Sequence, residues 1–350
     1  MMKNKIKLGS AVVLAVVLMV SALVLPTVYA ALGVNTDAKC SVVVSVPTEG
    51  FSELKSLPVV INLYKVAEID KEGQYEPTAD FASLDLSSLG SDKTANAWEE
   101  KAAAAKELVT EDVEVIASME LSEGTATAGD LPTGLYLVDA QKAESDAYAY
   151  EFKPYLISLP NNYFYTSDND EWVYENVAIG LKPERSDRYG DLIIAKALPV
   201  YNETIGGATF VFQVEAVKTD VDTNEEKVVY SDVVSMTFTA PGYKEIRIKD
   251  LPAGAEVTVT EVYSGASYEL VSEAVQTAVI VVEGTEEEPN ETAKVEFENT
   301  YNKKFGGGSG VVNTFTYDGE SFEWHSTTQS PEEIQNTKPL LEAATKGEID

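Results

Sequence analysis

Three segments of the sequence alternate like β-strands, and each places one polar residue on an otherwise apolar face: Lys196 within residues 192–198, Glu261 within 257–263 and Asn299 within 294–301. Successive side chains of a strand point to opposite faces, so each polar residue shares its face with aliphatic or aromatic neighbours. Lysine and glutamate are almost never fully buried without a partner, and an unpaired amide in a core is costly. We therefore expect the amine, the carboxyl group and the carboxamide to point into one core. The simplest interpretation is a buried ion pair with an amide beside it.

These segments belong to a run of short strands that covers residues 184–302. Turn residues separate the strands at positions 202–203, 222–224, 241–242 and 252–254. Several short alternating strands between such turns predict an immunoglobulin-like β-sandwich.

The same region resembles a known family. Residues 190–302 resemble a collagen-adhesin B-type domain of Gram-positive surface proteins and pilins, on Lys196 in the opening strand and on the segments 210–212, 250–254, 260–261 and 297–300. In that family a lysine amine and an asparagine carboxamide condense into an intramolecular isopeptide bond, with a glutamate as proton shuttle. The resemblance implies a bond between Lys196 and Asn299, assisted by Glu261.

Such a condensation requires a core without water. Burial disfavours charge, so a buried lysine can lose its proton and attack the side-chain carbonyl as a neutral amine. A protonated glutamate would polarise the amide oxygen and pass protons to the departing ammonia. The reaction occurs once per molecule, so the protein is not expected to be an enzyme, and it needs no cofactor.

Residues 31–183 predict a first domain that is rich in strands, with a helical insert at 92–109. Cys40 lies on the apolar face of a strand at 39–46 and is expected to be a buried small hydrophobic residue. This half resembles the N-terminal domain of sortase-assembled backbone pilins, on the segments 63–67, 131–138, 154–160 and 172–175. The two resemblances imply an all-β protein with two tandem Ig-like sandwich domains of the collagen-adhesin B type, the first carrying the helical insert.

The first domain contains a weaker candidate for a second isopeptide bond, formed by Lys65, Asp139 and Asn176. Each of these shares a strand face with apolar residues. The acid, however, follows its preceding glycine more closely than Glu261 does, so ordinary placement at the surface or rim is favoured.

Lys182 is a candidate for linkage between subunits. It stands near the position at which backbone pilins carry the nucleophilic lysine that joins the next subunit. Its neighbours Gly180, Leu181 and Pro183 depart from the family's pattern. An ordinary lysine in the linker between domains is therefore an equal alternative.

Residues 1–30 have the pattern of a secretory signal peptide. Lys3, Lys5 and Lys7 precede an apolar run from position 11 to 25, and Ala30 ends a cleavage motif. The run is too short for a permanent transmembrane helix. We expect cleavage after Ala30 and a secreted or cell-surface protein with no membrane attachment through this segment.

The composition excludes several function classes. The chain has 58 acidic and 26 basic residues, a formal net charge of −32, and loss of the leader lysines makes the mature chain more negative by three. Such a chain repels nucleic acid and anionic lipid. A single histidine, His325, excludes a Ser-His-Asp triad and makes a histidine-based metal site implausible. Residues 220–224 imitate the start of a calcium loop, but Glu225 replaces the required glycine, so a hairpin turn is expected and no metal site.

Residues 303–350 form a tail in which the resemblance weakens. A Gly-rich stretch at 306–310 precedes a predicted hairpin at 314–324, which should dock on the domain because isolated hairpins are marginal in water. Ser330 to Glu333 carry a capping-box signature for a short helix. We find no Leu-Pro-x-Thr-Gly sorting signal in the sequence.

These observations predict an extracellular structural subunit of a Gram-positive pilus or surface appendage. Its expected partners are other pilin subunits and a sortase. The alternative is an adhesin or accessory module that binds a host protein or carbohydrate, which an exposed aromatic patch on the first domain would favour.

Overall fold

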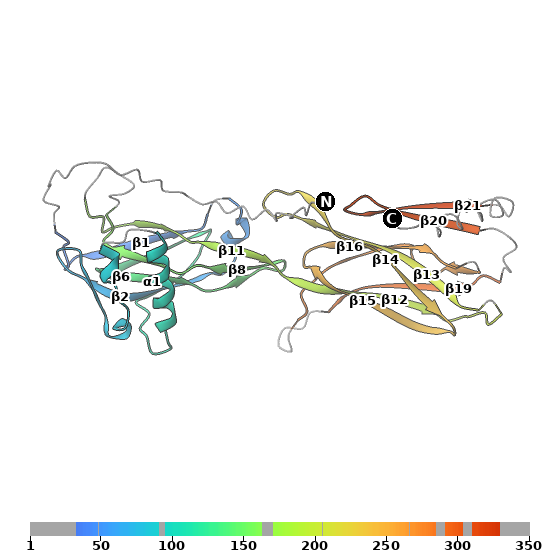
Figure 1. Cartoon of the computed structure of the whole chain (residues 1–350), viewed down its shortest axis with the longest axis horizontal. Coiled ribbons are helices and arrows are strands. Elements are labelled where there is room, and N and C mark those ends of the chain that lie inside the picture. Colours follow the sequence, from blue (N-terminus) through green and yellow to red (C-terminus); the bar gives the residue numbers. More distant parts are fainter. Residues whose placement is uncertain are drawn as a thin grey trace, which may run out of the picture.

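The computed structural model describes residues 33–47, 49–90, 95–162, 171–204, 206–265, 267–284, 291–303 and 310–329. In these residues, two β domains lie end to end along the long axis of the molecule (Figure 1). The predicted signal peptide and the predicted terminal helix lie outside the described residues. Among the helices of the described part, none has the length and apolar character needed to span a membrane.

The first domain combines small sheets with one helix. Strand β1 (Lys39–Ser45) lies between β5 (Thr125–Pro132) and β10 (Val177–Gly180). Strand β2 (Val60–Ile69) pairs with β3 (Tyr75–Pro77), β4 (Ala117–Glu120) and β6 (Gly134–Ala140), and β6 pairs with β9 (Tyr155–Leu159). Strand β8 (Tyr148–Phe152) lies between β7 (Ala143–Glu144) and β11 (Pro183–Asp187). Helix α1 (Ala95–Leu108) is the predicted insert.

Strand β6 is apolar on both faces because both faces are covered. Tyr136 and Val138 pack in the core between the sheets. Leu135 and Leu137 pack in a second core that includes Ala102 of α1. A strand covered on two sides reads as a continuous apolar run and not as an alternation. Cys40 is also buried, and burial raises the pKa of its thiol to about 11, which agrees with an unreactive cysteine.

The second domain is a sandwich of two four-stranded sheets. One sheet has the order β15 (Gly242–Pro252), β12 (Tyr189–Leu198), β19 (Ala293–Tyr301) and β17 (Tyr268–Leu270). The other has the order β14 (Glu226–Phe238), β13 (Ala208–Thr219), β16 (Glu256–Tyr263) and β18 (Val275–Val279). Burial along β13 alternates residue by residue, as the period of a half-covered strand requires. The all-β prediction with two sandwich-like domains is confirmed.

A glycine permits the close approach of two segments where the second domain begins. A Cβ atom at Gly190 would lie 1.9 Å from the carbonyl oxygen of Val281, so any other residue would force β12 and this segment apart.

The predicted hairpin in the tail is present and docks on the second domain. It consists of β20 (Gly310–Tyr317) and β21 (Phe322–Gln329). The amide N–H of Phe322 donates to Ser231 Oγ at 3.0 Å, and its carbonyl oxygen accepts from Gln213 Nε2 at 2.8 Å. The hairpin thus lies over the outer face of β13 and β14, as Figure 1 indicates.

Candidate functional site

The structure brings Lys196, Glu261 and Asn299 together in the core of the second domain. Lys196 lies on β12, and Asn299 lies on β19, which runs parallel beside it. Glu261 comes from β16 in the facing sheet. The exposed fractions are 0% for Lys196, 6% for Glu261 and 0% for Asn299, so the site is closed to solvent.

The carboxyl group of Glu261 contacts both of the other residues. The Lys196 ammonium nitrogen lies 2.7 Å from Oε2 of Glu261, and the amide nitrogen of Asn299 donates to Oε1 at 2.7 Å. Lys196 Nζ also contacts the side-chain oxygen of Asn299 directly. One carboxyl group therefore holds the amine and the amide at the same time, and the amine contacts the oxygen that is bonded to the carbon it would attack.

Strand register explains this geometry. Lys196 pairs with Phe297 across the parallel β12–β19 ladder. Asn299 stands two residues further along β19, and therefore on the same face. A long lysine side chain can cover this offset, whereas the carboxyl group reaches the pair from the opposite sheet.

Phenylalanine rings surround the amine. Nζ of Lys196 lies 4.7 Å from the ring centroid of Phe210 and 6.0 Å from those of Phe212 and Phe297. The rings exclude water, and their faces are the one apolar surface that tolerates a cation nearby.

Burial lowers the pKa of Lys196, although the hydrogen bond and the charge of Glu261 oppose this effect. Desolvation penalises the charged amine more than its partner stabilises it. A larger fraction of neutral amine is therefore present than for a surface lysine, and the neutral amine is the form that can act as a nucleophile.

A comparison with family profiles finds a match in the second domain. Residues 193–302 match a family profile described as a domain of unknown function, DUF5979. No curated protein matches the chain.

Several solved structures are similar to the chain. The TIE protein of Bacillus anthracis is 12% identical, with a TM-score of 0.31, over 83% of this chain and 43% of its own. The minor pilin GBS52 of Streptococcus agalactiae is 17% identical, with a TM-score of 0.22, over 75% of this chain and 96% of its own. The major pilin SpaD of Corynebacterium diphtheriae is 13% identical, with a TM-score of 0.30, over 77% of this chain and 99% of its own. The chain thus spans less than half of the TIE protein, and two of the three are pilins, the class that the sequence resembles.

Lys65, Asp139 and Asn176, the weaker candidates for a second isopeptide bond, do not lie together. Lys65 shares its face of β2 with Leu63 in the core between the sheets, whereas Asp139 shares its face of β6 with Leu137 on the helix side. The two side chains therefore leave the same sheet in opposite directions. Lys65 pairs with Glu68 at 2.6 Å, and Asp139 contacts Lys106 of α1.

Asn176, the third member, also lies elsewhere. It is exposed and adopts a left-handed backbone conformation with φ of 54°. Its amide N–H donates to Ser41 Oγ at 2.7 Å. The surface or rim placement that the sequence favoured holds for Asn176 and Lys65, whereas Asp139 is buried at 7% exposure beside Lys106.

Lys182 lies between β10 and β11 on the surface of the first domain. Its side chain is 48% exposed, and Nζ lies 3.3 Å from Oε1 of Glu99 on α1. The ammonium group also lies 5.6 Å from the ring centroid of Tyr155. The amine is thus accessible, and its two neighbours are an exposed carboxylate and an aromatic ring.

Sequence reasoning missed two features. The alternation of β13 identified the face of Phe210 and Phe212 but not their position over Lys196, because that position depends on how the sheets stack. The contacts between the domains were also missed. Arg185 and Asp222, which form one of them, are 37 positions apart and carry no local signal.

Proposed function

We propose that the chain is an extracellular structural subunit of a pilus or surface appendage, whose second domain is closed by an autocatalytic isopeptide bond between Lys196 and Asn299. The observation that carries this proposal is the contact of both Glu261 oxygens with the two reacting groups in a solvent-free core. An ion pair between Lys196 and Glu261 would not require the Asn299 amide beside it, and buried ion pairs contribute little net stability.

The reaction balances without a cofactor. Lys196 passes a proton to Glu261, and the neutral amine attacks the side-chain carbonyl carbon of Asn299. The protonated Glu261 lies at the amide nitrogen of Asn299, whose hydrogen bond to Oε1 is 2.7 Å long, and this is the atom that needs a proton in order to leave. Glu261 then gives its proton to the departing Asn299 nitrogen, which leaves as ammonia, and takes up the second proton of the attacking Lys196 nitrogen, so that a neutral secondary amide remains. An amine and a primary amide become a secondary amide and ammonia, and no oxidant or reductant is needed.

The position of the bond suits a molecule under tension. β12 begins directly after the first domain, and β19 is the strand that leads to the tail. The two strands lie side by side and run parallel, so a pull along the chain would shear them apart. A covalent bond between them would carry the force in place of the hydrogen bonds of the ladder.

The experiment that tests the bond is the intact mass of the mature protein. The wild type should be lighter than its sequence by one ammonia, and Glu261→Ala should restore the full mass. Glu296→Ala is the matched control, because Glu296 is an exposed glutamate of β19 whose partner is Lys294, and it should retain the loss. An unmodified wild-type mass would contradict the proposal.

Linkage to other subunits through Lys182, by a sortase, belongs to the same proposal. The exposed amine on the first domain supports it. The adhesin alternative gains no support from the described part of the first domain. Exposed large aromatic side chains occur instead at the domain boundary and beyond it: Tyr189, Tyr243, Tyr317 and Trp324.

A further inference from the structure

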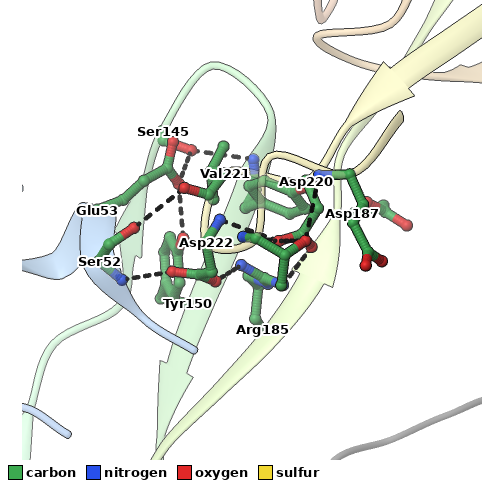
Figure 2. A network of polar contacts seen from close by, with 12 residues as sticks. Ser52, Glu53, Ser145, Tyr150, Arg185, Asp187, Asp220, Val221 and Asp222 are labelled. Atoms are coloured by element: carbon green, nitrogen blue, oxygen red, sulfur yellow. Dashed lines mark hydrogen bonds and ion pairs between the residues drawn. The ribbon is translucent and has the colours of Figure 1, made fainter. Parts of the chain in front are cut away.

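The turn between β13 and β14 of the second domain reaches into the end of the first domain. Val221, at the tip of this turn, packs against the core of the first domain. Beside it, Asp222 Oδ1 accepts the amide N–H of Ser52 at 2.9 Å, and Ser52 Oγ donates to the carbonyl oxygen of Val221 at 3.5 Å. Figure 2 shows the turn in contact with the segment of Ser52 and Glu53.

Arg185 of β11 holds the same turn from the other side. Its Nη1 lies 2.6 Å from Asp222 Oδ2, and its Nη2 lies 3.3 Å from Asp220 Oδ2 (Figure 2). The guanidinium group also lies 4.5 Å from the ring centroid of Tyr148. Arg185 is 22% exposed and Asp222 12% exposed, so this pair is screened far less than a surface ion pair.

The turn is shaped in advance for this contact. Asp220 Oδ1 accepts the amide N–H groups of Asp222 and Thr223, both at 2.9 Å. This side-chain turn leaves the second oxygen of Asp220 facing Arg185. The carboxylates of Asp220 and Asp222, which belong to the segment that imitates a calcium loop, are thus paired with an arginine. Within the described residues, no group of side chains is suited to hold a metal ion.

A second set of contacts lies on the linker. Lys218 of β13 pairs with Asp187 of β11 at 2.7 Å and lies 4.0 Å from the ring centroid of Tyr148. Arg188, the residue between β11 and β12, donates from Nη1 to the carbonyl oxygen of Ser145 at 2.6 Å. The contacts of Lys218 join β13 of the second domain to β11 and β8 of the first. The contact of Arg188 fixes the residue between β11 and β12 to the β7–β8 turn.

A glycine allows the two domains to approach each other at this point. Gly254 has φ of +79°, and a Cβ atom there would lie 3.0 Å from the Cβ of Ala147 in the first domain. The amide N–H of Ala253 donates to the carbonyl oxygen of Arg188 at 2.8 Å. Side chains and backbone groups from three separate segments of the first domain and two of the second therefore meet at one junction.

We propose that this junction is a latch, formed by Val221, Asp220 and Asp222 of one domain with Ser52, Tyr148 and Arg185 of the other, that holds the two domains as one rigid unit. Relative motion is the default for two domains joined by a short linker. Here an apolar anchor and a partly buried arginine that bridges two carboxylates oppose that motion. The inference concerns the joint between domains and stands whether or not the isopeptide bond forms.

The test is a distance distribution between spin labels on the two domains, measured by pulsed electron paramagnetic resonance. Cys40 is the only cysteine of the chain and is buried, so cysteines introduced at the exposed positions Glu107 and Glu273 can be labelled selectively. The wild type should give one narrow distribution. Arg185→Gln and Asp222→Asn should each broaden it, and the double variant should be no broader than Arg185→Gln, because the arginine variant already removes the contact with Asp222.

Arg247→Gln is the matched control. Arg247 also bridges two carboxylates, those of Asp191 and Glu283, but all three lie in the second domain. This variant should leave the distribution narrow. A broad wild-type distribution, or narrow distributions for both latch variants, would overturn the proposal. The near-isosteric Asp222→Asn guards against misfolding, which circular dichroism would detect in either variant.

Discussion

Stretching single molecules from the two ends of the mature chain should release very different lengths from the wild type and from Glu261→Gln. Lys196 and Asn299 are 103 positions apart. At about 3.3–3.6 Å per extended residue, the chain between them is about 340–370 Å long. An isopeptide bond keeps this segment out of the force path, so the wild type should not release it. Glutamine keeps the size of the side chain but cannot shuttle a proton, so the variant should release the full length.

Atomic force or optical-tweezer traces measure this length directly. Glu296→Gln, on the exposed side of β19, controls for the loss of a carboxylate and should behave as the wild type does. If the wild type released about 340–370 Å from its second domain, then Lys196 and Asn299 would not be covalently joined. If Glu261→Gln still withheld this length, the bond would form without the proposed proton shuttle.

Three further predictions follow from the same geometry. Loss of the bond in Glu261→Gln should lower the unfolding free energy of the second domain by about 4.7 kcal/mol, the chain-entropy effect of closing a loop of about 100 residues. The calorimetric midpoint of that domain should fall by roughly 20 °C, and an unchanged midpoint would contradict a covalent link. Lys182→Arg, which keeps the charge, should abolish sortase-dependent multimers on denaturing gels. Lys153→Arg, at an exposed lysine paired with Glu184 at 2.6 Å, should leave the multimers unchanged. Multimers of Lys182→Arg would exclude Lys182 as the linkage site. The latch should open in acid. The pKa of Asp220 is lowered by backbone hydrogen bonds from Thr223 and Asp222 and by Arg185, and the pKa of Asp222 is lowered because its contacts with Ser52 and Arg185 outweigh its burial. A carboxyl group whose pKa is lowered by folding stabilises the contact above the usual aspartate pKa of about 3.9 and loses this effect as the pH falls through the lowered pKa. The distance distribution should therefore stay narrow from neutral pH to about pH 5 and broaden below the usual aspartate pKa. The other titratable or charged groups at the junction are Arg185, Arg188, Lys218, Asp187 and Glu53. A distribution that stayed narrow in strong acid would assign the rigidity to the packing of Val221 and the backbone contacts, and not to the ion pairs.

The two sets of isopeptide candidates show that a local pattern predicts the face on which a residue lies but not which residues meet. The alternation that pointed to Lys196 also pointed to Lys65, because each lysine shares a strand face with aliphatic residues. In the second domain the three faces turn towards one core. In the first domain β2 and β6 form a sheet that is covered on both sides, so the faces of Lys65 and Asp139 belong to different cores. The face assignments of Lys65 and Asp139 were therefore correct, yet the two residues do not meet.

The tail gives a second example. The turn sequence between the aromatic residues predicted the hairpin, and the marginal stability of isolated hairpins predicted that it would dock. The docking site, at Gln213 and Ser231, followed from neither argument. It depends on which outer face is left uncovered when the sandwich closes.

The sequence by itself determined the strand-rich domains, the helical insert and the burial of Cys40. It also determined that Lys196, Glu261 and Asn299 each lie on the apolar face of a strand. These properties depend on the period of side chains along a single element, which is local. Only the tertiary structure decided that Glu261 contacts both Lys196 and Asn299, that Asp139 turns away from Lys65, and that Arg185 receives the turn of Asp222. Such contacts depend on the register and stacking of strands that are distant in the chain, and many sequences with the same period would stack differently.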